Sequence, residues 1–304
     1  MNASRRFVTS GAIELAVYTW GQPGAGRPAV LLVHGYPDSA QVWEQVARLL
    51  ATEHYVIAYD VRGAGYSGKP DSTAGYGLGH LIGDMAAVID ALSPQQPVHL
   101  VGHDWGALQG WEAVVSPRLQ GRIASWTAAA PGLDHVGLWF RKELAAGTGA
   151  GYRAALGQML GSWYMLAFQL PLLPELSWRL GLDRLWPTLL NTLEGITTEA
   201  PSPTRRADGI HGIGLYRANL LPRLLRPQAQ PTSVPTQLLV MQQDRFVPAR
   251  LFDGLQRFAP GLRRREISAG HWAPLSRPQE WAGHIADFVA DHHALPQTPA
   301  NTAT

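Results

Sequence analysis

Three residues of the types used in nucleophilic catalysis occur along the chain in the order Asp104, Asp244, His271. Asp104 lies in the motif Gly-His-Asp-Trp-Gly at residues 102–106, after a short apolar run and before a helical pattern. Glycines on both sides of one residue favour a tight strand–turn–helix elbow, which holds the middle side chain out into a site. A nucleophile, an acid and a histidine in this order predict a catalytic triad whose nucleophile is an aspartate instead of the usual serine.

An aspartate nucleophile restricts the chemistry. A carboxylate with an ordinary pKa of about 3.9 is ionised at neutral pH and needs no base to activate it. Attack on the saturated carbon of an epoxide or a halide forms an ordinary ester. Hydrolysis of that aspartyl ester then needs a general base for water, which suits His271 oriented by Asp244. It also needs oxyanion donors, for which we expect the backbone N–H groups of Tyr36 and Trp105.

The alkoxide that leaves from an epoxide and the halide that leaves from a haloalkane need different hydrogen-bond donors. An alkoxide needs a proton or a strong O–H donor, and tyrosine, with a pKa of about 10, matches it. A halide needs only weak N–H donors, such as tryptophan or asparagine. The predicted helical cap contains three tyrosines that could donate to an alkoxide, Tyr152, Tyr164 and Tyr216. The chain could therefore act on an epoxide, but the pattern alone leaves both an epoxide and a halide substrate open.

Strands and helices must bring these residues together. Up to about residue 132, apolar runs alternate with helical patterns, which predicts a parallel sheet with right-handed crossovers. Sites in such sheets lie beyond the carboxyl ends of the strands, where the three triad candidates fall. The alternation then stops for about a hundred residues that read as helical. We therefore predict a first core part at 1–133, a helical cap at 134–231, a second core part at 232–293 and a disordered tail at 294–304.

Composition limits the function classes. The 304 residues are 46% hydrophobic and carry a formal charge of +2, with no basic block for a nucleic acid. There are no cysteines, no pair of histidines has metal spacing, and we expect neither a metal nor a cofactor. No apolar signal core or run of 18 apolar residues is present, so we expect a cytoplasmic protein without an integral membrane segment, as a monomer or a homodimer.

Motifs along residues 5–292 resemble those of the α/β-hydrolase epoxide hydrolases. His-Gly-Tyr-Pro at 34–37 matches the H-G-x-P motif of that family, 102–106 matches its nucleophile motif, and Gly-His-Trp at 270–272 matches its histidine motif. The stretch at 162–226 is most similar to the hydrolase half of actinobacterial proteins that fuse such an enzyme to a short-chain dehydrogenase. The resemblance implies an α/β-hydrolase fold: a mostly parallel, doubly wound sheet with an inserted helical cap.

The same resemblance implies an activity and further site residues. The expected reaction converts an apolar epoxide and water into a vicinal diol through a covalent ester on Asp104. Two cap tyrosines hold and protonate the epoxide oxygen in that family, and Tyr164 and Tyr216 stand in matching contexts. The peptide before the proline of H-G-x-P is typically cis. We expect the pocket to be lined by His34, Pro37, Trp163, Phe168 and Trp272.

Two other functions stay open. A haloalkane dehalogenase would share Asp104, Trp105 and His271, although those enzymes commonly hold the halide with asparagine where this chain has Tyr36. A hydrolase-fold binding protein without turnover is the other alternative.

Two further aspartates have competing interpretations. Asp134 follows an apolar run and is a rival to Asp244 as the triad acid. Asp60 is expected to be structural and to brace its loop by pairing with Arg62.

Overall fold

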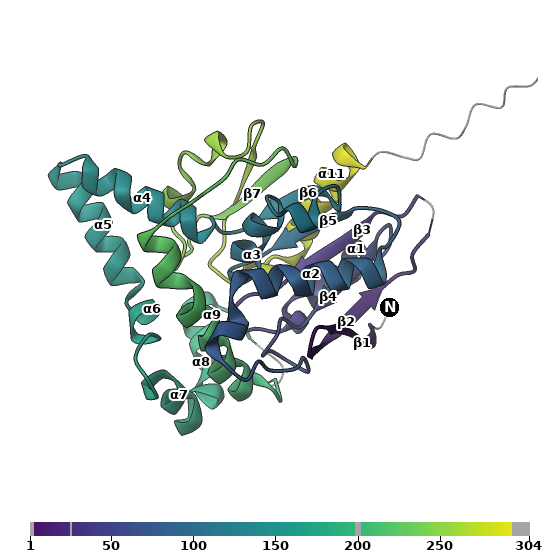
Figure 1. Ribbon diagram of the computed structural model, residues 1–304, viewed down its shortest axis with the longest axis horizontal. Coiled ribbons are helices and arrows are strands. Elements are labelled where there is room, and N and C mark those ends of the chain that lie inside the picture. Colours follow the sequence, from purple (N-terminus) through teal and green to yellow (C-terminus); the bar gives the residue numbers. More distant parts are fainter. Residues whose placement is uncertain (1–2, 25, 198–201, 294–304) are drawn as a thin grey trace, which may run out of the picture.

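A computed structural model describes residues 3–24, 26–197 and 202–293, and within them one sheet has the strand order β1-β2-β4-β3-β5-β6-β7-β8 (Figure 1). Pairing is parallel from β4 through β8 and antiparallel for β1 with β2 and β2 with β4. The predicted mostly parallel sheet is confirmed. The tail predicted at 294–304 lies outside the described residues. The strands are β1 (Ser4–Ser10), β2 (Ile13–Trp20), β3 (Ala29–Val33), β4 (Tyr55–Tyr59), β5 (Val98–Gly102), β6 (Ile123–Ala128), β7 (Thr236–Met241) and β8 (Arg263–Ile267).

The central strands are buried on both faces, which explains their continuous apolar sequences. In β3, Leu31 belongs to the core on one side of the sheet and Leu32 to the core on the other. Helices α2 (Leu78–Leu92) and α3 (Trp105–Ala113) cover the first side. Helices α1 (Glu44–Leu50) and α11 (Pro278–His292) cover the second, and a short α10 (Ala273–Ser276) precedes α11. The sheet is therefore doubly wound, as predicted.

A helical insertion separates β6 from β7. In Figure 1 its helices lie together on one side of the molecule, and α5, α6 and α7 form the outer edge away from β1 and β2. The predicted limits of the cap, 134 and 231, remain a prediction. Within the described residues, no helix is both long enough and apolar enough to pass through a membrane. The inserted helices are α4 (Leu133–Ala145), α5 (Gly149–Gly161), α6 (Trp163–Ala167), α7 (Leu173–Ser177), α8 (Asp183–Glu194) and α9 (Arg205–Leu225), with a π-helical turn at Trp178–Leu182.

A buried ion pair ties the loop after β4 to α2. Arg62 donates from Nε and Nη2 to the two carboxylate oxygens of Asp84, at 2.7 and 2.6 Å. The prediction that Arg62 pairs with Asp60 is wrong, because Asp60 instead accepts from the Ala40 and Tyr66 N–H groups and the Tyr18 hydroxyl. Sequence proximity favoured Asp60, but the guanidinium turns toward α2, where a bidentate partner is available.

Replacement of Asp84 by alanine should lower the free energy of unfolding by about 3–5 kcal/mol, because it leaves the Arg62 charge buried without a partner. Glu44→Ala is the matched control, since it breaks a Glu44–Arg48 pair whose side chains are 42% and 50% exposed. That change should cost at most about 1 kcal/mol. Urea unfolding of both variants measures the difference, and equal losses would contradict the importance of the buried pair.

Candidate active site

The turn between β5 and α3 raises Asp104 out of the sheet. Its backbone has φ 51° and ψ −124°, outside the regions that most residues adopt, as expected at a nucleophile elbow. Near Asp104, adjacent segments pack so closely that two glycines have no room for a side chain. A Cβ on Gly106 would overlap the Val33 carbonyl, and one on Gly35 would overlap the Asp104 carboxylate. The elbow predicted from the sequence spacing therefore exists here as a tightly packed junction of β3, β5 and α3.

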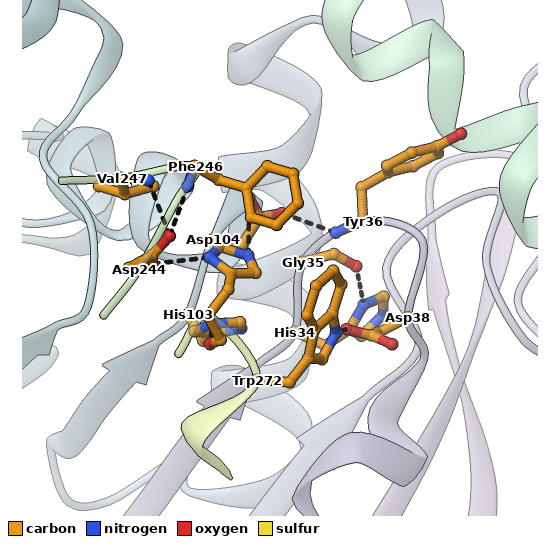
Figure 2. A network of polar contacts seen from close by, with 11 residues as sticks. His34, Gly35, Tyr36, Asp38, His103, Asp104, Asp244, Phe246, Val247 and Trp272 are labelled. Atoms are coloured by element: carbon orange, nitrogen blue, oxygen red, sulfur yellow. Dashed lines mark hydrogen bonds and ion pairs between the residues drawn. The ribbon is translucent and has the colours of Figure 1, made fainter. Parts of the chain in front are cut away.

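Two backbone N–H groups face the Asp104 carboxylate. The Tyr36 N–H donates to Oδ1 at 2.7 Å, as Figure 2 shows. Burial raises the pKa of Asp104, while His271 and the N–H groups of Tyr36 and Trp105 oppose that rise. The peptide between Tyr36 and Pro37 is cis, as the motif implied. Both expected oxyanion donors thus lie beside the nucleophile.

The other two members of the predicted triad, His271 and Asp244, lie near Asp104, and Figure 2 labels Asp244. His271 Nδ1 lies 2.8 Å from Oδ2 of Asp244, and its Nε2 lies 3.8 Å from Oδ2 of Asp104. The second oxygen of Asp244 accepts from the N–H groups of Phe246 and Val247 at 2.7 and 2.8 Å. Asp244 is therefore in a position to orient the imidazole. The rival acid Asp134 instead forms a 2.5 Å ion pair with Arg223.

Tyr164 on α6 and Tyr216 on α9 approach Asp104 from the helical insertion. Their rings are 6.5 Å apart, and the Tyr216 ring packs edge-on against Trp105 at 4.9 Å. Burial raises the pKa of both hydroxyls, and the Asp104 charge raises it further. The Trp105 side chain opposes this rise of the pKa of Tyr216. The third tyrosine, Tyr152, is 52% exposed on α5 and lines neither of the cavities described next.

Two apolar cavities, of about 530 and 410 Å³, meet at the candidate nucleophile. Both are lined by Asp104, Tyr164, Tyr216 and Phe246. Such apolar cavities with a few convergent polar groups are typical of small-molecule sites. Four of the residues expected to line the pocket border the larger cavity: Pro37, Trp163, Phe168 and Trp272.

His34 corrects the expected lining, because it borders neither of the two cavities. It lies beneath the oxyanion loop, where Nδ1 donates to the Gly35 carbonyl and Nε2 accepts from the Val61 N–H, both at 2.8 Å. Two backbone partners use up both ring nitrogens, so His34 braces the loop that carries Tyr36.

The Tyr36 side chain connects the oxyanion loop to the insertion. Its hydroxyl donates to the Gly209 carbonyl of α9 at 2.9 Å and accepts from the Trp178 indole N–H at 2.8 Å. A single residue therefore contacts the nucleophile with its backbone and two inserted elements with its side chain.

Comparison with known proteins agrees with this arrangement. Residues 28–278 match the family model described as the alpha/beta hydrolase fold. The chain belongs to the alpha/beta hydrolase fold family. It is 35% identical over 297 residues to the "Probable oxidoreductase EphD" of Mycobacterium tuberculosis, with 94% of the chain and 49% of that relative covered. It thus spans about half the length of the first curated relatives that it matches.

Two further relatives carry the name epoxide hydrolase. Epoxide hydrolase 3 of Xenopus tropicalis is 27% identical over 279 residues, which cover 87% of this chain and 72% of that relative. The crystal structure of the Vigna radiata epoxide hydrolase superimposes with a TM-score of 0.74 at 21% identity, over 95% of this chain and 98% of that one. The structural match demonstrates the shared fold, and the sequence matches confirm the resemblance expected from the motifs.

The candidate site also contains a third carboxylate near His271 that no sequence motif marks. Glu194 ends α8, and its carboxylate lies against Gly270, where a Cβ would overlap it. The backbone N–H groups of His271 and Trp272 lower the pKa of this carboxylate, although burial raises it overall. Neither a motif nor periodicity identifies Glu194, because its role depends on where α8 ends relative to a loop about 76 residues later.

Three carboxylates determine the protonation of His271. Burial by itself lowers the pKa of the imidazole, but Asp244, Asp104 and Glu194 together raise it to about 9. Before any substrate has reacted with Asp104, His271 is therefore expected to be mostly protonated at neutral pH. Loss of any one of these negative charges lowers its pKa.

Replacement of Glu194 by glutamine should lower the pKa of His271 below about 9, because one of the three negative charges is lost. NMR titration of the imidazole signals, assigned with His271→Gln, measures the shift. Glu143→Gln is the control, since that carboxylate lies beside Lys142 on α4 and is not among the groups that shift His271. An unchanged pKa in Glu194→Gln would exclude this role for the carboxylate.

Proposed function

We propose that this protein is an epoxide hydrolase that converts an apolar epoxide and water into a vicinal diol. The observation that carries the proposal is the convergence of a carboxylate nucleophile, Asp104, and two tyrosines, Tyr164 and Tyr216, on the same apolar cavities. A carboxylate can open a strained ring, and the hydroxyls can protonate the oxygen that leaves. The names of the relatives support this choice. A cytoplasmic location and a monomeric or dimeric state remain predictions from the sequence.

The first step forms an ester. Oδ1 of Asp104 is held by the Tyr36 N–H, which leaves Oδ2 as the nucleophilic atom. Oδ2 attacks a ring carbon, the bond from that carbon to the epoxide oxygen breaks, and the oxygen takes a proton from Tyr164 or Tyr216. The Trp105 side chain, which lowers the pKa of Tyr216 against the effect of burial, favours the tyrosinate that results.

The second step hydrolyses the ester. Esterification removes the charge of Asp104, so the pKa of His271 falls. The imidazolium then gives its proton to the tyrosinate, which restores the tyrosine and leaves a neutral imidazole that can act as a base. His271 takes a proton from water, which attacks the ester carbonyl, and the oxyanion at Oδ1 is held by the Tyr36 and Trp105 N–H groups. The carbonyl–Oδ2 bond breaks, and the diol leaves with a proton from His271. The new carboxylic acid of Asp104 then gives its proton to His271, which restores the carboxylate and the protonated imidazole.

A His271→Gln variant should accumulate a covalent ester on Asp104 when it is mixed with an aliphatic or aromatic epoxide. Loss of the base slows hydrolysis by about a hundredfold or more, while ring opening continues. Intact-protein mass spectrometry with peptide mapping detects the adduct, and Asp104→Asn is the control that cannot form it. Absence of an adduct would reject the mechanism. Halide release from a chloroalkane, without diol from any epoxide, would instead identify a dehalogenase.

Tyr164→Phe and Tyr216→Phe should each lower single-turnover ring opening by about a hundredfold, because each change removes one O–H donor to the leaving oxygen. The double variant should lose more than either single variant. Tyr152→Phe is the matched control within the insertion and should leave turnover of a dissolved epoxide unchanged. Rapid-quench measurement of ester formation provides the rates, and unaffected ring opening in both single variants would contradict the role of the tyrosines.

A further inference from the structure

Helix α5 presents apolar side chains to solvent. Leu156, Met159 and Leu160 occupy positions i, i+3 and i+4 and therefore share one face of the helix. They are 56%, 50% and 64% exposed. Helices of globular proteins normally bury such a stripe against the core, so this orientation needs an explanation.

The exposed apolar surface continues beyond α5. Trp163 on α6 is 66% exposed, and Leu172 and Leu180 in the following segments are 75% and 77% exposed. Leu172 also has φ 65°, a left-handed conformation that leucine rarely adopts. Because α5, α6 and α7 form the outer edge of the molecule in Figure 1, these side chains belong to the surface farthest from β1 and β2. We call the exposed apolar side chains of residues 156–185 the apolar edge.

The apolar edge is continuous with the candidate active site. Trp163 and Leu173, 66% and 56% exposed, line the larger cavity. Met159 and Leu166, 50% and 51% exposed, line the smaller one. The same helices thus supply both the exposed surface and the walls of the two cavities.

The charges around this surface are of one sign. Between residues 134 and 197, all of which are described, every charged side chain that is largely exposed is basic. The acidic side chains of this segment are more buried, and Glu175 and Asp183 are paired with arginines of α9. The exposed basic residues are Arg141, Lys142, Arg153, Arg179 and Arg184.

We propose that the apolar edge binds the surface of a bilayer that contains anionic phospholipids. Exposed apolar helices interleaved with arginine and lysine are the chemistry of interfacial helices, whose apolar side chains enter the acyl boundary while the cations contact headgroup phosphates. A symmetric contact with a second copy would bring the same basic side chains face to face, which disfavours that occupant. The cavities would then open toward the lipid, where apolar substrates dissolve. Binding itself does not depend on the proposed activity.

Flotation of the intact protein with phosphatidylcholine vesicles, with and without phosphatidylglycerol, tests the proposal. We expect binding to the anionic vesicles, weakening as salt is raised, and little binding to phosphatidylcholine alone. Leu160→Ser and Leu180→Ser should each lower the partition coefficient about tenfold, since each removes one apolar side chain from the acyl boundary. Arg153→Gln combined with Arg179→Gln should weaken binding only to the anionic vesicles.

The matched control is Leu49→Ser on α1, a 40% exposed leucine outside the insertion, which should leave binding unchanged. Absence of binding to the anionic vesicles, or equal loss in Leu49→Ser, would overturn the proposal. Light scattering on the eluting protein provides the other decisive result. A dimer that Leu160→Ser and Leu180→Ser dissociate, in a protein that does not bind vesicles, would show that a second copy covers the apolar edge.

Discussion

The steric closure around Asp104 is the constraint on which the rest of the site depends. Its backbone is held in a sparsely populated conformation, and the chain at Gly35 and Gly106 approaches so closely that no Cβ would fit. Strain of this kind persists only where the surrounding packing over-determines the backbone. Strands β3 and β5, which are buried on both faces, supply that packing. The rigid sheet core thereby holds the Asp104 carboxylate in a fixed position.

Charge balance is the second organising feature. One buried imidazole faces Asp104, Asp244 and Glu194, so the resting site contains more negative than positive groups. In a medium of low dielectric constant, such an imbalance favours the protonated histidine. The proposed reaction changes this balance itself, because esterification neutralises one carboxylate. In the proposed reaction, His271 therefore becomes able to act as a base only after Asp104 has reacted, and this change needs no movement of the chain.

Features that are marked by short sequence patterns could be predicted from the sequence, whereas contacts between distant segments could not. The elbow and the buried strands depend on short spacings, and glycines at fixed positions mark the turn. The order of the triad residues along the chain can be read directly, although they lie far apart in the sequence. Tyr164 and Tyr216 were selected by resemblance to a family and not by pattern, since the insertion contains a third tyrosine of equal chemical capacity. Glu194, the role of His34 and the Arg62–Asp84 pair depend on contacts between distant segments, which no spacing rule encodes. The sequence also gives little sign of strand β1, because most of its side chains are exposed and it is held by pairing with β2.

The hydrogen bonds of Tyr36 restrict how the helical insertion can move to let small molecules enter and leave the cavities. Its N–H holds the nucleophile, while its hydroxyl is bonded to both α9 and the turn that contains Trp178. Swinging the whole insertion away from the sheet would break these bonds and release the oxyanion donor at the same time. A route that leaves these bonds intact avoids that penalty, so the bonds of Tyr36 favour an insertion that stays fixed on the sheet over one that opens as a hinged lid.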